Sequence, residues 1–327
     1  MEKDIILKIE NLYKDFNLEA GFFSKKEKTI YAVNNLSLSL KRGTTYGIVG
    51  ESGCGKTTTA RLIIQMYKAT SGNIFFKSKD SETVLDVSSL NKKDLKLYRE
   101  KVKYIFQDPA RSLNPRTNIF DIITAGIRYS SKWIDKKTAY ESAVKIIEEV
   151  GLSEADLLKR PTEFSGGQRQ RISIARGLIM NPELLICDEV VSALDVSVQS
   201  QIINLLLELK EKYNITILFI SHDLSVVSYI SDRVGVMYGG MLMEEAAADK
   251  IMTEHCHPYT KLLYSSVVKS SRNSELERAE NEVANLVVQV SGCPFANRCP
   301  MADNYCRENI PQMKEKSPGH RVACHKV

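Results

Sequence analysis

The sequence of 327 residues predicts an α/β fold built around a parallel sheet. Short apolar, β-branched runs have the length of strands that are covered on both faces, and they lie at 45–49, 102–106, 184–187 and 215–220. Between the last two runs, residues 198–213 carry apolar side chains at helical spacing. A strand, a helix and a strand in that order are typical of a parallel α/β sheet.

Other elements of the chain fit around this sheet. No convincing strand occurs from about 108 to 163, and 139–150 has the pattern of an amphipathic helix, so we expect a helical insertion. Two apolar runs at 234–243, separated by two glycines, predict a late hairpin. The polar stretch 269–282 has the composition of a helix or linker that leads to a cysteine-rich tail.

The overall composition excludes several classes of protein. With 43% hydrophobic and 26% charged residues, the chain is typical of globular rather than disordered proteins. The net charge of +5 is too small to argue for nucleic acid as a partner. No apolar run approaches the length of a membrane span, and the charged N-terminus lacks the apolar core of a signal peptide. These observations predict a cytosolic protein with reduced thiols.

Residues 50–57 form the most specific motif, because they fit the phosphate-binding pattern G-x-x-x-x-G-K-[ST] between a predicted strand and a predicted helix. Glycines allow backbone N–H groups to turn toward phosphates, and the helix adds its positive end. Lys56 is a mobile cation for the β- and γ-phosphates of ATP, and the Thr57 hydroxyl can ligate Mg²⁺. We assign nucleotide contacts to Gly50, Ser52, Gly53, Cys54, Gly55, Lys56, Thr57 and Thr58.

A second motif places two carboxylates after the apolar run 184–187. A buried strand at this point delivers Asp188 and Glu189 to the carboxyl edge of the sheet, beside the phosphate-binding loop. Asp188 is then expected to hold Mg²⁺, directly or through water. Glu189 is expected to orient the attacking water or accept its proton.

Residues 164–171, Phe-Ser-Gly-Gly-Gln-Arg-Gln-Arg, resemble the signature sequence of ATP-binding cassette (ABC) ATPases, with Phe164 in place of the usual Leu. The resemblance implies that this turn closes on the γ-phosphate of an ATP held by a partner subunit. Two ATP molecules would then lie between two subunits. The residues concerned are Ser165, Gly166, Gly167 and Gln168.

The same resemblance implies roles for four further residues. Gln107 is similar to the Q-loop glutamine that senses Mg²⁺ and the transmembrane partner. Asp195 lies in a segment similar to the D-loop, which crosses the dimer interface, and His222 resembles the switch histidine that contacts the γ-phosphate. Phe16 is the aromatic residue that we expect to stack on adenine, in competition with Tyr13, Phe22 and Phe23.

The resemblance covers about residues 5–268 and implies a P-loop NTPase fold with a RecA-like core, an antiparallel β subdomain and an inserted helical subdomain. We expect the ATP-binding core at 1–107 and 172–246, the helical subdomain with the signature at 108–171, and a C-terminal extension at 247–327. Motifs at 50–56, 106–116 and 257–260 are similar to those of oligopeptide/dipeptide importer ATPases, and 187–197 resembles their F-type subunit. Val190 departs from that pattern, which usually has Pro.

This family resemblance implies an ATP-hydrolysing subunit, peripheral at the cytoplasmic face of the cell membrane, that powers peptide import. Its partners would be a paired homologous ATPase subunit in a heterodimer, two transmembrane permease subunits and an extracellular peptide-binding protein. The alternatives are a soluble ABC ATPase of the translation or DNA-repair type, an importer subunit for another solute such as nickel, and a binding-only regulatory subunit. The presence of Glu189 and His222 argues against the last.

The tail contains a metal-binding pattern formed by Cys293, Cys299, Cys306 and Cys324. Four thiolates suit Zn²⁺ or a [4Fe–4S] cluster, and the spacing leaves the metal open because neither a zinc knuckle nor the common ferredoxin spacing is present. His320 and His325 would add nitrogen ligands suited to zinc. The segments 292–300 and 319–325 resemble the tail of peptide-importer ATPases, some of which hold [4Fe–4S]. We therefore favour the cluster over Zn²⁺, and Zn²⁺ over no metal.

Overall fold

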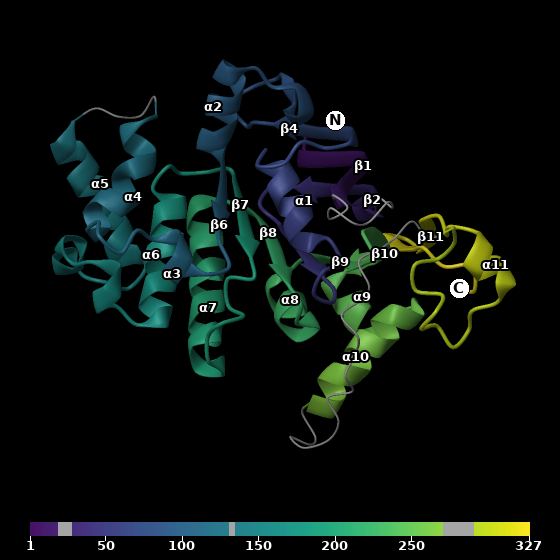
Figure 1. The fold of residues 1–327 in the computed structure, drawn as a ribbon. Helices are drawn as coiled ribbons and strands as arrows, with labels where there is room; N and C mark the ends of the chain where they lie inside the picture. Colours follow the sequence, from purple (N-terminus) through teal and green to yellow (C-terminus); the bar gives the residue numbers. More distant parts are fainter. Residues whose placement is uncertain (19–27, 131–134, 271–290) are drawn as a thin grey trace, which may run out of the picture.

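The computed structural model describes residues 1–18, 28–130, 135–270 and 291–327. Its centre is an eight-stranded sheet of order β11-β12-β10-β9-β3-β8-β7-β6 (Figure 1). Five adjacent strands run parallel: β9 (Arg233–Tyr238), β3 (Thr45–Val49), β8 (Thr216–Ser221), β7 (Leu184–Asp188) and β6 (Val102–Ile105). The four strands predicted for a parallel sheet are all present, with ends that differ by at most one residue.

Alternation along β7 shows why the run at 184–187 is apolar throughout. Leu184 and Ile186 belong to one hydrophobic cluster, while Leu185 and Cys187 belong to the other. Because successive side chains of a strand point to opposite faces, a sheet with a core on each side requires apolar residues at every position. The helices α6 (Gly166–Leu178), α7 (Val196–Tyr213) and α8 (Leu224–Ile230) contribute to one core, and α1 (Lys56–Ile63) contributes to the other.

A second, antiparallel sheet of order β2-β1-β4-β5 packs on the α1 side of the central sheet. Its strands are β1 (Ile5–Leu18), β2 (Lys28–Lys41), β4 (Ser71–Lys77) and β5 (Val84–Asp86). A 3₁₀ turn, η1 (Val87–Ser89), and helix α2 (Lys92–Lys101) connect this sheet to β6.

The region between β6 and α6, in which the sequence predicted no strand, is helical. Between β6 and α6, the described residues contain α3 (Pro109–Ser112), α4 (Ile119–Arg128) and α5 (Lys136–Glu149), followed by the 3₁₀ turns η2 (Glu154–Leu158) and η3 (Pro161–Glu163). The three helices begin after N-caps Asp108, Asn118 and Asp135, whose side chains accept backbone N–H groups of the first turn. These caps fix where each helix starts, while apolar faces pack into the core next to α6.

The C-terminal part of the chain returns to the central sheet. The predicted hairpin is formed by β9 and β10 (Met241–Ala247) and is followed by α9 (Ala248–Thr253) and α10 (Pro258–Ser270). The last residues form α11 (Asn304–Glu308), β11 (Lys314–Ser317) and β12 (His320–Val322), and β12 pairs with β10. Of the predicted helix or linker at 269–282, the part after residue 270 lies outside the described residues. Among described helices, none is long and apolar enough to cross a membrane.

Candidate functional site

The loop at 50–55 joins β3 to α1, and its shape requires glycine. Gly55 has a φ of +106°, and a Cβ atom there would lie 2.2 Å from the carbonyl oxygen of Ala32. Lys56 is only 4% exposed and donates to the carbonyl oxygens of Gly50 at 2.7 Å and Glu51 at 2.9 Å. The ammonium group and the first N–H groups of α1 therefore lie at the mouth of one loop, which is the arrangement that binds phosphates.

Asp188, at the end of β7, is buried against the phosphate-binding loop. The Thr57 hydroxyl donates to its Oδ1 at 3.1 Å, and the Tyr104 hydroxyl donates to its Oδ2. Burial raises the pKa of the Asp188 carboxyl, and a bound divalent cation would favour its ionised form. Thr57 and Asp188 offer the oxygen ligands that Mg²⁺ prefers, so the residues fit this ion. Tyr104 carries no local sequence signal for this contact, which arises because its strand β6 pairs with β7.

Glu189 is held between Gln107 and His222, which follow the neighbouring strands β6 and β8. Gln107 Nε2 donates to Glu189 Oε2 at 2.9 Å, and His222 Nδ1 lies 3.6 Å from Glu189 Oε1. The backbone N–H of Glu189 donates to the carbonyl oxygen of Ile220 at 2.9 Å, and its φ of +49° turns the residue away from the strand. The carboxyl ends of three parallel strands thus bring together the predicted catalytic residues.

The His222–Glu189 contact predicts a pH dependence. The neighbouring carboxylate raises the pKa of His222, and the imidazole lowers the pKa of Glu189. The contribution of His222 to stability is complete below its ordinary pKa and is lost as the pH rises through the raised value. The contribution of Glu189 is lost as the pH falls through its lowered pKa.

We therefore expect an NMR titration of the imidazole resonances to give His222 a pKa above 6.5, and Glu189→Gln to lower it. The resonances of the other four histidines serve as internal controls, because the substitution should not affect them. An unchanged pKa of His222 in the variant would show that the two side chains do not interact in solution.

The signature turn lies at the N-terminus of α6. Ser165 Oγ accepts from the N–H of Gln168 at 3.3 Å, and Gln168 Oε1 accepts from the N–H of Ser165 at 2.9 Å. A Cβ on Gly167 would lie 2.6 Å from Val198 Cγ1, so this position requires glycine. Asp195 caps α7 through the N–H of Val198 at 2.9 Å. Because Ser165, Gln168 and Asp195 are exposed, this surface is available to a second subunit.

Phe16 occupies a half-buried position on β1, opposite Ile30 of β2. Its ring packs edge-on against Tyr67 at a centroid distance of 5.5 Å, and Lys14 Nζ lies 4.8 Å above it. The pairing places Phe16 near Ala32, whose carbonyl oxygen faces Gly55 of the phosphate-binding loop. Its role toward adenine stays a prediction, and its competitors Phe22 and Phe23 lie outside the described residues.

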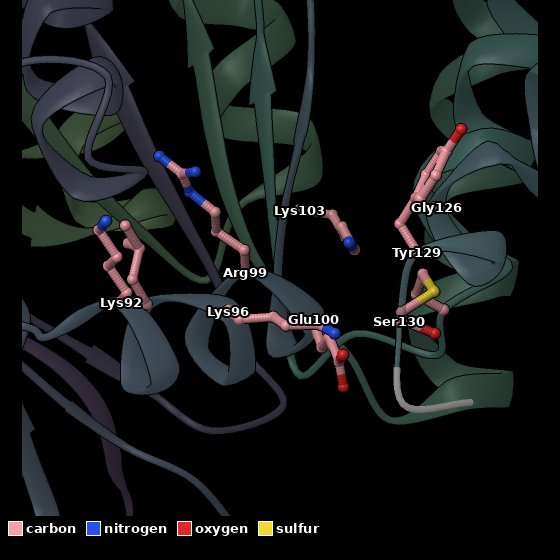
Figure 2. Close-up of a pocket in the computed structure, with 10 residues that line it drawn as sticks. Lys92, Lys96, Arg99, Glu100, Lys103, Gly126, Tyr129 and Ser130 are labelled. Atoms are coloured by element: carbon pink, nitrogen blue, oxygen red, sulfur yellow. The ribbon is translucent and has the colours of Figure 1, made fainter. Parts of the chain in front are cut away.

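A cleft of about 270 Å³, which we had not predicted, lies between α2 and the helical insertion. Figure 2 shows the side chains of Lys92, Lys96 and Arg99 on α2 across from Tyr129 and Ser130, which follow α4. Lys103 of β6 lies between these two walls. The α2 side of the cleft therefore carries three basic side chains and one acid, Glu100, and the other side carries Tyr129, which is 76% exposed.

The four cysteines of the tail lie in one region. The N–H of Cys293 donates to the carbonyl oxygen of Cys306 at 2.8 Å, which joins two of their segments. Burial, together with the nearby thiols of Cys324, Cys299 and Cys306, raises the pKa of the Cys293 thiol to about 11. A metal centre on these four thiols stays a prediction, because among the described residues only Glu244, Cys256 and His320 form a group of possible metal ligands.

His320 and His325 have other partners than these cysteines. His320 Nε2 lies 2.7 Å from Glu244 Oε1, and His325 Nε2 donates to the carbonyl oxygen of Asn309 at 3.0 Å. Glu244, Cys256 and His320 form a separate group whose ligand atoms lie within 4.8 Å of one another. Both Glu244 oxygens accept backbone N–H groups, from Cys256 and from His257, so hydrogen bonds account for this buried carboxylate.

Comparison with known proteins decides the family. A family model described as ABC transporter matches residues 33–192, and one described as oligopeptide/dipeptide transporter, C-terminal region, matches residues 243–306. The chain is 44% identical to the oligopeptide transport ATP-binding protein AppF of Bacillus subtilis, over 99% of this chain and 98% of that protein. This chain belongs to the ABC transporter ATP-binding proteins of the oligopeptide/dipeptide family.

Other similar proteins agree with this ABC ATPase assignment. A probable peptide ABC transporter ATP-binding protein of Sinorhizobium fredii is 40% identical over 98% of this chain and 90% of its own length. Among solved structures, the ATP-binding cassette MJ0796, a dimer in a post-hydrolysis state bound to ADP and Pi, superposes with a TM-score of 0.64. It is 26% identical, with 74% of this chain and 99% of that one covered. The fold is that of an ABC ATPase, and the activity is ATP hydrolysis.

Proposed function

We propose that this ABC ATPase hydrolyses ATP to power the import of oligopeptides or dipeptides. The observation that carries the proposal is the match to oligopeptide transport ATP-binding proteins along nearly the whole chain, including the C-terminal region at 243–306. Comparison with these relatives does not favour a translation, DNA-repair or nickel-import role.

The chemistry follows from the ends of the parallel strands. The loop at 50–57 holds the triphosphate, and Lys56 turns from its carbonyl partners toward the β- and γ-phosphates. Thr57, Asp188 and Gln107 would hold Mg²⁺, which supplies charge neutralisation when bound. Glu189 orients the attacking water, and His222 contacts the γ-phosphate. These groups position reactants and stabilise developing charge, so no covalent intermediate is needed.

We also propose that ATP is hydrolysed between two paired, homologous ATPase subunits in a heterodimer. The exposed turn at 165–168 would close on the nucleotide of the partner, with Asp195 at the interface. The exposure of both segments supports this arrangement, as does the dimeric state described for MJ0796.

The membrane partners proposed here are two permease subunits, with an extracellular peptide-binding protein as donor of the peptide. The chain would then lie at the cytoplasmic face of the membrane as a peripheral subunit. The basic cleft formed by Lys92, Lys96 and Arg99 supports this arrangement, because it offers a docking place to a permease segment with acidic side chains.

The proposed subdomains divide the chain at 108, 172 and 247. Residues 1–107 and 172–246 would form the RecA-like core with its antiparallel β subdomain, and 108–171 the helical subdomain. The extension at 247–327 would carry a [4Fe–4S] cluster on Cys293, Cys299, Cys306 and Cys324. The engagement of His320 and His325 elsewhere favours an all-thiolate centre, with Zn²⁺ as the alternative.

Reconstitution in liposomes tests the proposed function. The chain, co-expressed with its partner ATPase and the two permeases, is expected to show an ATPase rate that rises several-fold when the peptide-bound binding protein is added. Ni²⁺ with its own binding protein serves as the control solute. Stimulation by Ni²⁺ but not by peptides, or failure to associate with any permease, would contradict peptide import.

A further inference from the structure

Glu51, the second residue of the phosphate-binding loop, is held by groups from three directions. Its backbone N–H donates to the Tyr259 hydroxyl oxygen at 2.9 Å, and its carbonyl oxygen accepts from Lys56 Nζ at 2.9 Å. Its carboxylate accepts two hydrogen bonds from Arg298, at 2.7 and 2.9 Å. Tyr259 and Arg298 belong to the C-terminal part of the chain, so that part of the molecule contacts the loop that binds phosphate.

The contact between Arg298 and Glu51 has the geometry of a strong ion pair. Two parallel N–H···O bonds fix both planar groups, and each side chain is less than one third exposed. Such a pair is less screened by solvent than a surface pair.

Arg298 is itself supported by a cluster of aromatic rings. Its guanidinium carbon lies 5.8 Å from the ring centroids of both Tyr238 and Phe295. Tyr259 and Phe295 are at most 1% exposed, and their centroids lie 5.3 Å apart. This packing leaves little freedom to the groups that hold Glu51.

The charge of Glu51 gives this contact a consequence for the nucleotide. Glu51 is the only acidic residue between 50 and 58, where the loop must accept a triphosphate. An unpaired carboxylate in this loop would repel that anion, whereas a carboxylate bound to Arg298 is neutralised and turned toward the extension.

We propose that Tyr259 and Arg298 are positioning residues of the ATP site, which act through Glu51 to keep the phosphate-binding loop in shape and to neutralise its one acidic side chain. Arg298 and Phe295 lie between Cys293 and Cys299. The short segment that contains two proposed metal ligands is thus the segment that touches the loop. Order in the cysteine region would in this way influence nucleotide affinity.

Nucleotide affinity tests this inference, which rests on ATP binding at this loop. The full-length chain is titrated with the fluorescent analogue mant-ATP and Mg²⁺. Arg298→Ala is expected to raise Kd about tenfold, equivalent to about 1.4 kcal/mol. Tyr259→Phe, which removes the acceptor of the Glu51 N–H, is expected to raise Kd about threefold.

Two further variants separate the proposed role from a general effect on the extension. Arg321→Ala removes another ion pair of the extension, with Glu245 at 3.2 Å, which does not involve the loop. It should leave Kd within about twofold of wild type. Adding Glu51→Gln to Arg298→Ala removes the unpaired charge and should recover most of the affinity.

The possible outcomes are distinguishable. If wild type fails to bind mant-ATP, the proposed function itself is wrong. If wild type binds but Arg298→Ala binds equally well, the positioning role is wrong. Equal losses in Arg298→Ala and Arg321→Ala, or no recovery in the double variant, would show that Arg298 does not act through Glu51, which would also overturn the inference.

Discussion

Glu189→Gln is expected to lower the ATPase rate of the assembled transporter by about a hundredfold or more while ATP remains bound. Gln has nearly the same shape as Glu, so the contact with Gln107 can persist, but it has no charge with which to orient water or accept its proton. Glu189 is the carboxylate that Gln107 and His222 fix at the carboxyl edge of the sheet. Phosphate release in single-turnover conditions measures this step directly.

Glu148→Gln is the matched control for this substitution, because Glu148 is an exposed acid on α5. It should hydrolyse ATP at the wild-type rate. An undiminished rate in Glu189→Gln would contradict the assigned role of Glu189. It would favour a subunit that only binds ATP while the partner subunit hydrolyses it.

Cys306→Ser is expected to remove most of the iron that we expect the anaerobically purified wild type to contain. The wild type should be brown and should carry about four iron atoms and as many inorganic sulfides per chain. The side chain of Cys306 is buried, and its carbonyl oxygen accepts a hydrogen bond from Cys293. Solvent therefore cannot reach this position to supply the missing ligand without disturbing both segments. Metal analysis and the visible spectrum give the result.

Cys256→Ser provides the matched control, since Cys256 is half-buried but lies beside Glu244 and His320, outside the group of four. This variant should keep its iron. Zinc without iron in a colourless wild-type sample would overturn the cluster and support the zinc alternative.

The elements that sequence reasoning predicted are those with a local signal. The buried strand at 184–188 is recognisable because both faces of the sheet are covered, which removes polar residues from every position. The loop at 50–57 is recognisable because phosphate binding requires glycine and lysine at fixed spacing. The grouping of Gln107, Glu189 and His222 follows once their strands are parallel neighbours.

The remaining features depend on contacts without such a signal. Glu51 and Arg298 are 247 positions apart, and each alone has the appearance of an ordinary surface charge. Tyr104 bonds to Asp188 only because β6 and β7 are adjacent. Likewise, β12 is too short for its pairing with β10 to be read from periodicity. Tertiary pairing of distant side chains creates these contacts, and local patterns do not report it.

The pairing of β12 with β10 also covers an edge of the central sheet. Without the last two strands, the backbone N–H and C=O groups on this side of β10 would be unpaired and could pair with a strand of another molecule. The outermost strand is instead β11, a short segment of sequence Lys-Glu-Lys-Ser whose first three side chains are exposed. Such charged, short edges resist edge-to-edge stacking. Deleting the residues beyond 290 would thus leave β10 as an unpaired sheet edge, and we expect that fragment to aggregate. Its aggregation would conceal what the extension contributes to ATP binding.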